Sequence, residues 1–160
     1  MPPRIRARSR SGRARSRRDH LVCSPIGCGV DVVELGRFRR SLKRGGRAFL
    51  SRIYTDAEVR YAKAHRDPVP HLAARFAAKE AVMKALWQLD PTLVLGFRQI
   101  EVRNDRLGRP HAVLNHVSAA VHISLSHADG VAVASAVAIT AGAVRPVSRL
   151  STVRAAMAWR

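Results

Sequence analysis

The sequence contains few residues of several kinds, and each shortage excludes a class of protein. Its 160 residues include only two cysteines, Cys23 and Cys28, too few to hold together a small secreted fold and not spaced as a zinc-binding pair. No apolar run approaches the roughly 18 residues that cross a membrane. Aromatic residues make up only 5%, so the chain offers little for stacking on nucleic-acid bases. These shortages predict a soluble, reduced, cytoplasmic protein with no membrane partner.

Acidic residues are also scarce, with 11 Asp and Glu against 29 Lys and Arg, which gives a net charge of +18. The first eighteen residues contain eight arginines and no acid, and the segment after Val144 contains four arginines and no acid. Removing these twelve charges leaves +6 for residues 19–144. We predict a disordered Arg-rich extension over residues 1–24, a folded domain over 25–142 and a basic tail over 143–160. The basic domain favours a partner that is acidic or carries phosphate.

The middle of the chain alternates strand and helix patterns. Thr55 and Glu58 form a capping-box pattern that predicts a helix over residues 56–65, ended by the prolines that follow. A longer helix is predicted over 71–89, and strands are predicted over 26–33, 98–103, 110–114, 121–126 and 131–139, the last four as two hairpins. Helices in the first half and mainly antiparallel strands in the second half indicate an α+β fold.

Asp31 interrupts an otherwise apolar strand and is the first candidate for a functional residue. A buried carboxylate without a partner costs several kcal/mol, so it needs a metal, a cation or several hydrogen-bond donors. The glycines before it, Gly27 and Gly29, would let a bulky ligand approach the backbone. The alternative is an aspartate at the end of a strand that caps a neighbouring helix.

Glu80 is the second candidate, because it borders the buried face of the long predicted helix. On a helical projection the apolar stripe of this helix consists of four side chains expected to face the core, Leu72, Phe76, Met83 and Trp87. Glu80 falls at the edge of that stripe. The alternative is a charged helix flank in which Glu80 pairs with Lys84 one turn later.

The two acids together favour a magnesium site that acts on a phosphorylated substrate. Mg²⁺ takes one or two carboxylates and completes its shell with water and phosphate oxygens. Lys84 and Arg75 lie close enough in the sequence to neutralise the remaining phosphate charge. The chain has no GxxxxGK[ST] and no GxGxxG motif, which excludes the common nucleotide-binding folds.

Four stretches, taken in order, resemble the holo-[acyl-carrier-protein] synthases, the small bacterial type of 4′-phosphopantetheinyl transferase. They are IGCGVDVVE from Ile26 with Arg37, RFAAKEA from Arg75 with Lys84 and Ala85, Gly108-Arg109-Pro110, and Ser124-Leu125-Ser126-His127. The resemblance covers about residues 26–139. It implies the phosphopantetheinyl transferase fold, a homotrimer with sites at subunit boundaries, and a role in fatty acid biosynthesis.

The resemblance also implies a reaction in which the phosphopantetheine group of coenzyme A moves to a serine of apo-acyl carrier protein, releasing adenosine 3′,5′-bisphosphate. Asp31 and Glu80 match the Mg²⁺ ligands, and Glu80 accepts the serine proton either directly or through a metal-bound water. Lys84 matches the lysine that stabilises the charged transition state.

Further residues match binding positions of the family. Arg75 and His127 match positions near the nucleotide phosphates, and Lys79 is a third candidate there. Arg37 matches a basic residue on the first helix that meets the acidic carrier. For His127, the alternative is a side chain that satisfies carbonyls of the turn at Asp129.

Two other functions stay open from the sequence. One is an Arg-rich nucleic-acid-binding protein, although no nucleic acid is expected as a partner, because the body lacks an aromatic platform and any such motif. The other is a catalytically impaired relative that only binds the carrier. The chain also departs from the family after the long helix, where no glycine occurs before Gly96 in the 87–96 loop.

Overall fold

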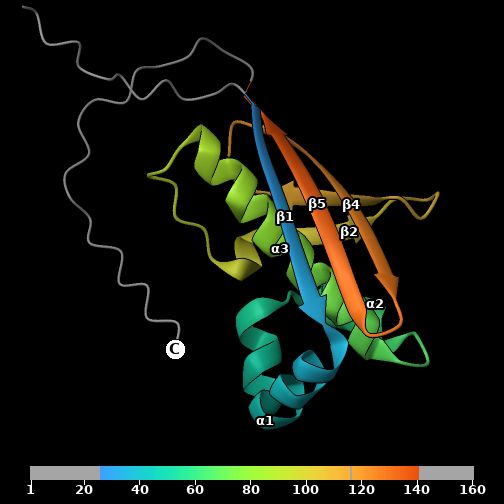
Figure 1. The fold of residues 1–160 in the computed structure, drawn as a ribbon. Helices are drawn as coiled ribbons and strands as arrows, with labels where there is room; N and C mark the ends of the chain where they lie inside the picture. Colours follow the sequence, from blue (N-terminus) through green and yellow to red (C-terminus); the bar gives the residue numbers. More distant parts are fainter. Residues whose placement is uncertain (1–25, 116, 141–160) are drawn as a thin grey trace, which may run out of the picture.

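A computed structural model describes residues 26–115 and 117–140 (Figure 1). The predicted extension over 1–24 and the predicted basic tail over 143–160 lie outside the described residues. The elements follow in the order β1 (Ile26–Glu34), α1 (Leu35–Ile53), α2 (Asp56–Lys63), α3 (Pro68–Leu89), the short 3-10 helix η1 (Phe97–Gln99), β2 (Ile100–Asn104), β3 (Pro110–Leu114), β4 (Ala120–Ala128) and β5 (Val131–Ile139). The predicted α+β class is confirmed. No helix in the described part of the chain is long and apolar enough to cross a membrane.

The strands form two antiparallel sheets. One has the order β1-β5-β4, and the other is the hairpin β2-β3. Asp31 of β1 pairs with Ala134 of β5, which pairs in turn with Leu125 of β4. Both predicted hairpins are confirmed. The predicted strand start at residue 98 is wrong, because residues 97–99 form η1, closed by a hydrogen bond from Gly96 N to the Gln99 side chain at 2.7 Å.

Helix α3 crosses one face of the three-stranded sheet (Figure 1). It packs there because Gly27 and Gly29 carry no side chain. A Cβ atom on Gly27 would lie 1.9 Å from the carbonyl oxygen of Ala85, and one on Gly29 would lie 1.9 Å from that of Ala81. The glycines therefore admit the backbone of α3, and the expectation that they admit a ligand is wrong.

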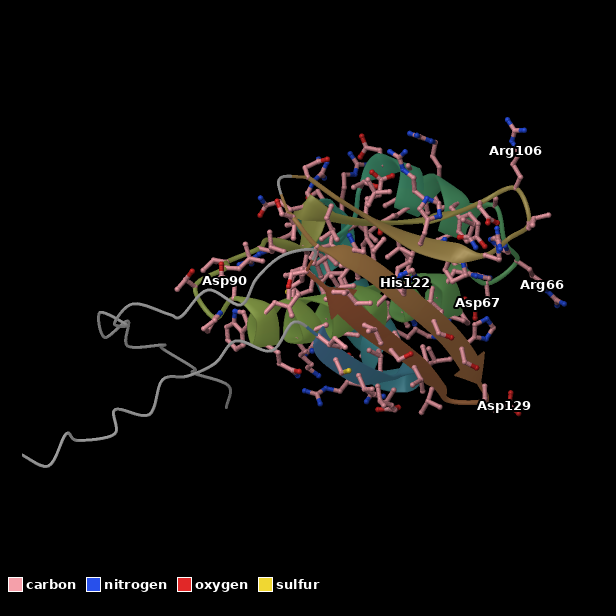
Figure 2. All side chains as sticks on the ribbon, turned by 90° about the horizontal axis from the view of Figure 1, so that it is seen from above. Arg66, Asp67, Asp90, Arg106, His122 and Asp129 are labelled. Carbon is pink, nitrogen blue, oxygen red and sulfur yellow. The ribbon has the colours of Figure 1, made fainter. Side chains whose placement is uncertain are left out.

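Helix α3 begins three residues before the predicted start at residue 71. Pro68 and Pro70 lie in its first turn, where a missing backbone N–H has no helical partner to lose. The Asp67 side chain caps the helix by accepting a hydrogen bond from Val69 N at 3.0 Å. In Figure 2, Asp67 and Asp90, which flank α3, lie toward opposite ends of the molecule.

The predicted apolar stripe of α3 is wrong at its C-terminal end. Leu72 is buried, but Trp87 is 50% exposed. The buried positions of α3 instead surround most of the helix, and six of the thirteen are alanines (Ala73, Ala74, Ala77, Ala78, Ala81 and Ala85). A helix covered on several sides does not show the single stripe of an amphipathic surface helix.

Helix α1 follows β1 directly and carries many basic residues. Glu34 caps it by accepting a hydrogen bond from Arg37 N at 3.2 Å, and Gly46 bends it with a φ of 50° that glycine tolerates. Phe38 and Ile53 are buried in a second apolar cluster with the start of α3. The exposed positions include Arg37, Arg39, Arg40, Lys43 and Arg44.

Candidate functional site

Asp31 and Lys84 meet where β1 lies against α3. Lys84 Nζ donates to Asp31 Oδ1 at 2.8 Å and to the carbonyl oxygen of Val30 at 2.9 Å. The Asp31 side chain is 19% exposed, so this carboxylate is largely enclosed. The alternative role of Asp31 as a helix cap is wrong, because Glu34 caps the helix that follows.

Glu80 lies one helical turn before Lys84 and faces the same region. In the described part of the chain, its carboxylate makes no hydrogen bond or ion pair, so the alternative pairing of Glu80 with Lys84 does not occur. Partial burial raises the pKa of Glu80, and the negative charge of Asp31 raises it further, whereas Lys84 opposes the shift. A raised pKa suits a proton acceptor near neutral pH.

The donor set of this site fits a magnesium ion that also binds phosphate. The negative charge of Asp31 raises the pKa of Glu80, and one ammonium group, Lys84, opposes this effect only in part. The described residues contain no group of three or more His, Cys, Asp and Glu side chains that could hold a metal by themselves. A site with two carboxylates leaves room for the water and phosphate ligands that Mg²⁺ prefers.

Lys79 lies elsewhere, although it adjoins Glu80 in the sequence. Its Nζ donates three hydrogen bonds, to the Glu58 carboxylate at 2.8 Å and to the carbonyl oxygens of Ile53 and Phe97, both at 2.9 Å. Both side chains of the Lys79–Glu58 pair are fully buried. Because an ammonium group has three protons, Lys79 has none left for a phosphate, and this geometry does not place it at coenzyme A.

Arg75 is buried between α2, α3 and β2. Its guanidinium lies 3.8 Å from the centre of the Tyr61 ring and donates to Asn104 Oδ1 at 2.8 Å and to the carbonyl oxygen of His71 at 3.3 Å. Its Nε is buried and has no hydrogen-bond partner in the described structure. The Nε–H of Arg75 is therefore free for a further acceptor.

His127 belongs to a cluster of side-chain rings that extends to Arg75. The centre of the His127 ring is 5.7 Å from that of the His71 ring, and the His71 ring lies 3.7 Å from the His65 ring at an angle of 32°. Burial lowers the pKa of His71, and the charges of His65, His127 and Arg75 lower it further. No hydrogen bond joins the His127 ring to the adjacent turn in the described residues, so the alternative role of His127 is not seen.

The structure thus divides the predicted residues into two groups. Asp31, Glu80 and Lys84 come together, whereas Arg75 and His127 gather near the start of α3. His71 and Glu80 are nine residues apart on the same helix, which corresponds to about 13 Å along its axis.

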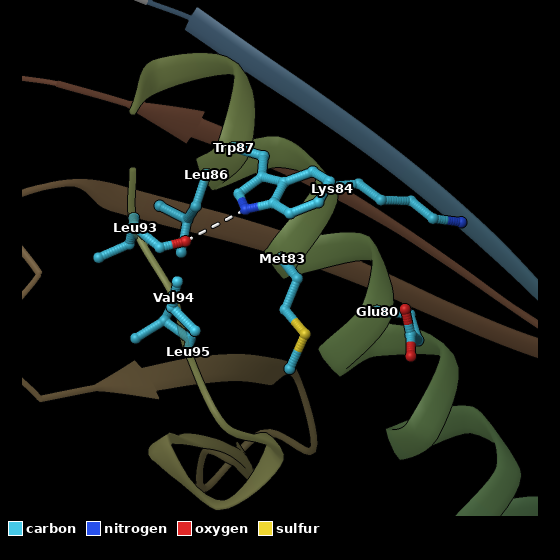
Figure 3. A pocket seen from close by; sticks show the side chains of 8 residues that line it. All are labelled: Glu80, Met83, Lys84, Leu86, Trp87, Leu93, Val94 and Leu95. Atoms are coloured by element: carbon cyan, nitrogen blue, oxygen red, sulfur yellow. Dashed lines mark hydrogen bonds between the residues drawn. The ribbon is translucent and has the colours of Figure 1, made fainter. Parts of the chain in front are cut away.

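Sequence reasoning missed three further features beside the site. An apolar pocket with Glu80 and Lys84 in its wall follows the end of α3 (Figure 3). Gln88 pairs with the outer edge of β1, donating to Cys28 O at 2.6 Å and accepting from Cys28 N at 3.1 Å. His65 and His71 form the ring cluster. The one sequence signal for any of these features was the absence of glycines after α3, which concerns the segment beside the pocket.

Two carboxylates and an ammonium group held between a strand and a helix have the chemistry to bind a cation and a phosphate. Comparison with known proteins specifies the family. Residues 27–141 match the model of the 4′-phosphopantetheinyl transferase superfamily, and the chain belongs to this family.

Relatives and solved structures agree with this assignment. A holo-[acyl-carrier-protein] synthase of Thermodesulfovibrio yellowstonii is 41% identical over 108 residues, covering 68% of this chain and 93% of the relative. One of Chlorobaculum tepidum is 46% identical over 110 residues, covering 68% and 93%. The crystal structure of a holo-(acyl-carrier-protein) synthase of Bacillus anthracis in complex with CoA (3′,5′-ADP) is similar with a TM-score of 0.62 and 35% identity, covering 72% of this chain and 96% of the other.

Proposed function

We propose that the protein transfers the 4′-phosphopantetheine group of coenzyme A to a serine of an apo-acyl carrier protein. The Asp31–Lys84–Glu80 arrangement carries this proposal, because it combines a cation site with a proton acceptor in a chain that belongs to this family. The relatives are named for the same activity, and one similar structure is described as a complex with coenzyme A.

In the proposed mechanism, Asp31 and Glu80 hold Mg²⁺, which when bound would neutralise the pyrophosphate and polarise the reacting phosphate. The serine oxygen forms a bond to the β-phosphorus, and the bond from that phosphorus to the departing adenosine 3′,5′-bisphosphate breaks. Glu80 accepts the serine proton, either directly or through a water molecule beside it. Lys84 stabilises negative charge on the phosphate in the transition state.

Two further groups bind the substrates. The free Nε of Arg75 and the ring of His127 offer donors to the phosphates of the nucleotide. Arg37 and its exposed basic neighbours on α1 form a positively charged surface for an acidic carrier protein. A carrier of fatty acid biosynthesis and a polyketide carrier both fit such a surface.

The protein is also proposed to form a homotrimer. The sheet face opposite α3 exposes five large apolar side chains on two neighbouring strands: Ile26, Val30, Val32, Val137 and Ile139. Contiguous apolar surface of this kind is typical of a subunit interface.

Mass spectrometry of the carrier tests the proposal. Incubation of apo-carrier with the protein, coenzyme A and Mg²⁺ should increase the carrier mass by one phosphopantetheine group. Asp31→Ala and Glu80→Ala should abolish the increase, whereas Asp56→Ala, an exposed acid at the start of α2, should not. An unmodified carrier, or full transfer by both site variants, contradicts the proposal.

A further inference from the structure

The outer edge of β1 is held by side chains of α3. Strand β1 lies at the edge of the β1-β5-β4 sheet, so only one side of it pairs with a strand in the described structure. On the other side, the Gln88 carboxamide donates to Cys28 O at 2.6 Å and accepts from Cys28 N at 3.1 Å. These are the two hydrogen bonds that a residue of an antiparallel neighbour would exchange with Cys28. Gln88 therefore takes the place of a strand residue at this point of the edge.

Lys84 makes the next contact along the same edge. Its Nζ donates at 2.9 Å to the carbonyl oxygen of Val30, two residues after Cys28. Four residues of a helix rise about 6 Å and two residues of a strand about 7 Å, so the two elements stay in step. One step further along both elements lie Glu80 on α3 and the residues beside Asp31 on β1. The contact at Cys28 is thus in register with the proposed catalytic groups.

The close backbone contacts show the same register. Ala85 meets Gly27 and Ala81 meets Gly29, so two residues of β1 again match four residues of α3. A Cβ atom on Gly27 would also lie 3.3 Å from the Cβ of Gln88. Backbone packing brings the two elements together, whereas the directional hydrogen bonds of Gln88 limit how far β1 can slide along α3.

Lys84 alone does not secure this register during the proposed reaction. Its side chain is 47% exposed and extends toward β1 in Figure 3. Its ammonium group has three protons, of which two are shared with Val30 O and Asp31 Oδ1, and it must also serve the phosphate. The Gln88 carboxamide carries no charge, so its two bonds to Cys28 do not depend on the charge of a phosphate or a cation.

We infer that Gln88 is a positioning residue of the proposed reaction, an inference that rests on the proposed function. By holding Cys28, it fixes the register of β1 against α3. That register places the Asp31 carboxylate 2.8 Å from Lys84 Nζ and on the side of β1 that faces Glu80. The partner of Gln88 is a backbone group of β1, so Gln88 acts through the position of Asp31 and not on the substrate.

Steady-state kinetics of Gln88→Met test this inference, because methionine keeps the length and helix preference of glutamine but loses both hydrogen bonds. We expect kcat for carrier modification to fall about tenfold, since β1 is held less firmly against the catalytic groups, with the KM for the carrier unchanged. Gln99→Met is the matched control. Gln99 also accepts a hydrogen bond from a backbone N–H, that of Gly96 at 2.7 Å, but it lies in η1 and outside the β1–α3 contact, so kcat should not change.

Hydrogen exchange of the Cys28 amide measures the same contact without activity. Its N–H donates to Gln88, so Gln88→Met should accelerate the exchange about tenfold, whereas Gln99→Met should leave it unchanged. Gln88 is exposed, so its replacement requires no repacking of the core.

Three results would overturn the inference. They are an unchanged kcat in Gln88→Met, an unchanged exchange rate of the Cys28 amide in that variant, and an equal loss of kcat in Gln99→Met, which would assign the effect to a general loss of stability. A protein that modifies the carrier equally well with Gln88→Met refutes only the positioning role, whereas a protein that modifies no carrier refutes the proposed function.

Discussion

Replacement of Gly29 by alanine tests whether the close approach of α3 to β1 holds the site together. The new Cβ would lie 1.9 Å from Ala81 O, although such contacts essentially never fall below 3.0 Å. The obstacle is the helix backbone, which cannot turn away as a side chain can. Strand and helix must therefore separate by about 1.1 Å, the difference between these two distances.

This separation predicts both a stability loss and a rate loss. Overpacking of this kind costs about 1–3 kcal/mol, and a loss near the upper end should lower the melting temperature by about 10 °C. The Lys84–Asp31 contact would lengthen from 2.8 Å to about 3.9 Å, beyond hydrogen-bond range. A shift of about 1 Å at reacting groups can lower a rate about 100-fold.

Thermal unfolding followed by circular dichroism, and single-turnover carrier modification well below the melting temperature, measure the two effects separately. Gly96→Ala is the matched control, because its Cβ would meet only the Gln99 side chain at 3.5 Å and should change neither result. A Gly29→Ala protein with normal melting and normal turnover would refute the packing argument. A destabilised variant with a normal rate would refute the link between this contact and the site.

Three further perturbations test other parts of the structure. Lys79→Met should lower the free energy of unfolding by about 3–5 kcal/mol in urea titrations, because Glu58 is left charged and buried. A smaller loss in the double variant with Glu58→Met would confirm that the two side chains are coupled. Equal losses in the single and double variants would contradict it. Because the pKa of His71 is lowered in the folded protein, the unfolded chain binds a proton first as pH falls below about 6.5, and stability should fall there. His71→Gln should therefore reduce the fall in melting temperature between pH 8 and 5. An unchanged fall in the variant would show that His71 is not its cause. Arg37→Glu should raise the KM for the carrier about tenfold and leave that for coenzyme A unchanged; a parallel rise in both would argue against carrier docking at α1.

Features that depend on neighbouring residues could be predicted from the sequence. The Thr55–Glu58 capping box predicted the start of α2, and both of its hydrogen bonds are present. The Asp129-Gly130 turn predicted the second hairpin, and Gly130 has the positive φ of 87° that such a turn favours. These signals are local, because the interacting atoms lie within a few residues of one another.

Features that depend on distant packing could not be predicted. The helical projection placed Trp87 in the core, but α3 is enclosed on several sides and its C-terminal end leaves Trp87 beside the pocket. Gly27 and Gly29 indicated a close approach to β1, but the sequence could not identify α3 as the approaching element. Ala81 and Ala85, the residues that meet Gly29 and Gly27, follow them by 52 and 58 positions in the chain.

The two lysines beside Glu80 separate what the sequence determined from what the tertiary structure decided. The sequence by itself determined the family pattern, the α+β order and the presence of two acids with nearby basic residues. It matched Lys84 to the site and left Lys79 as a candidate at the nucleotide phosphates, because both lysines lie on the same helix near Glu80 and nothing local shows that Lys79 is buried. The fold turns Lys79 toward buried Glu58 and Lys84 toward Asp31. That choice depends on which elements cover each side of α3, and only long-range packing sets it.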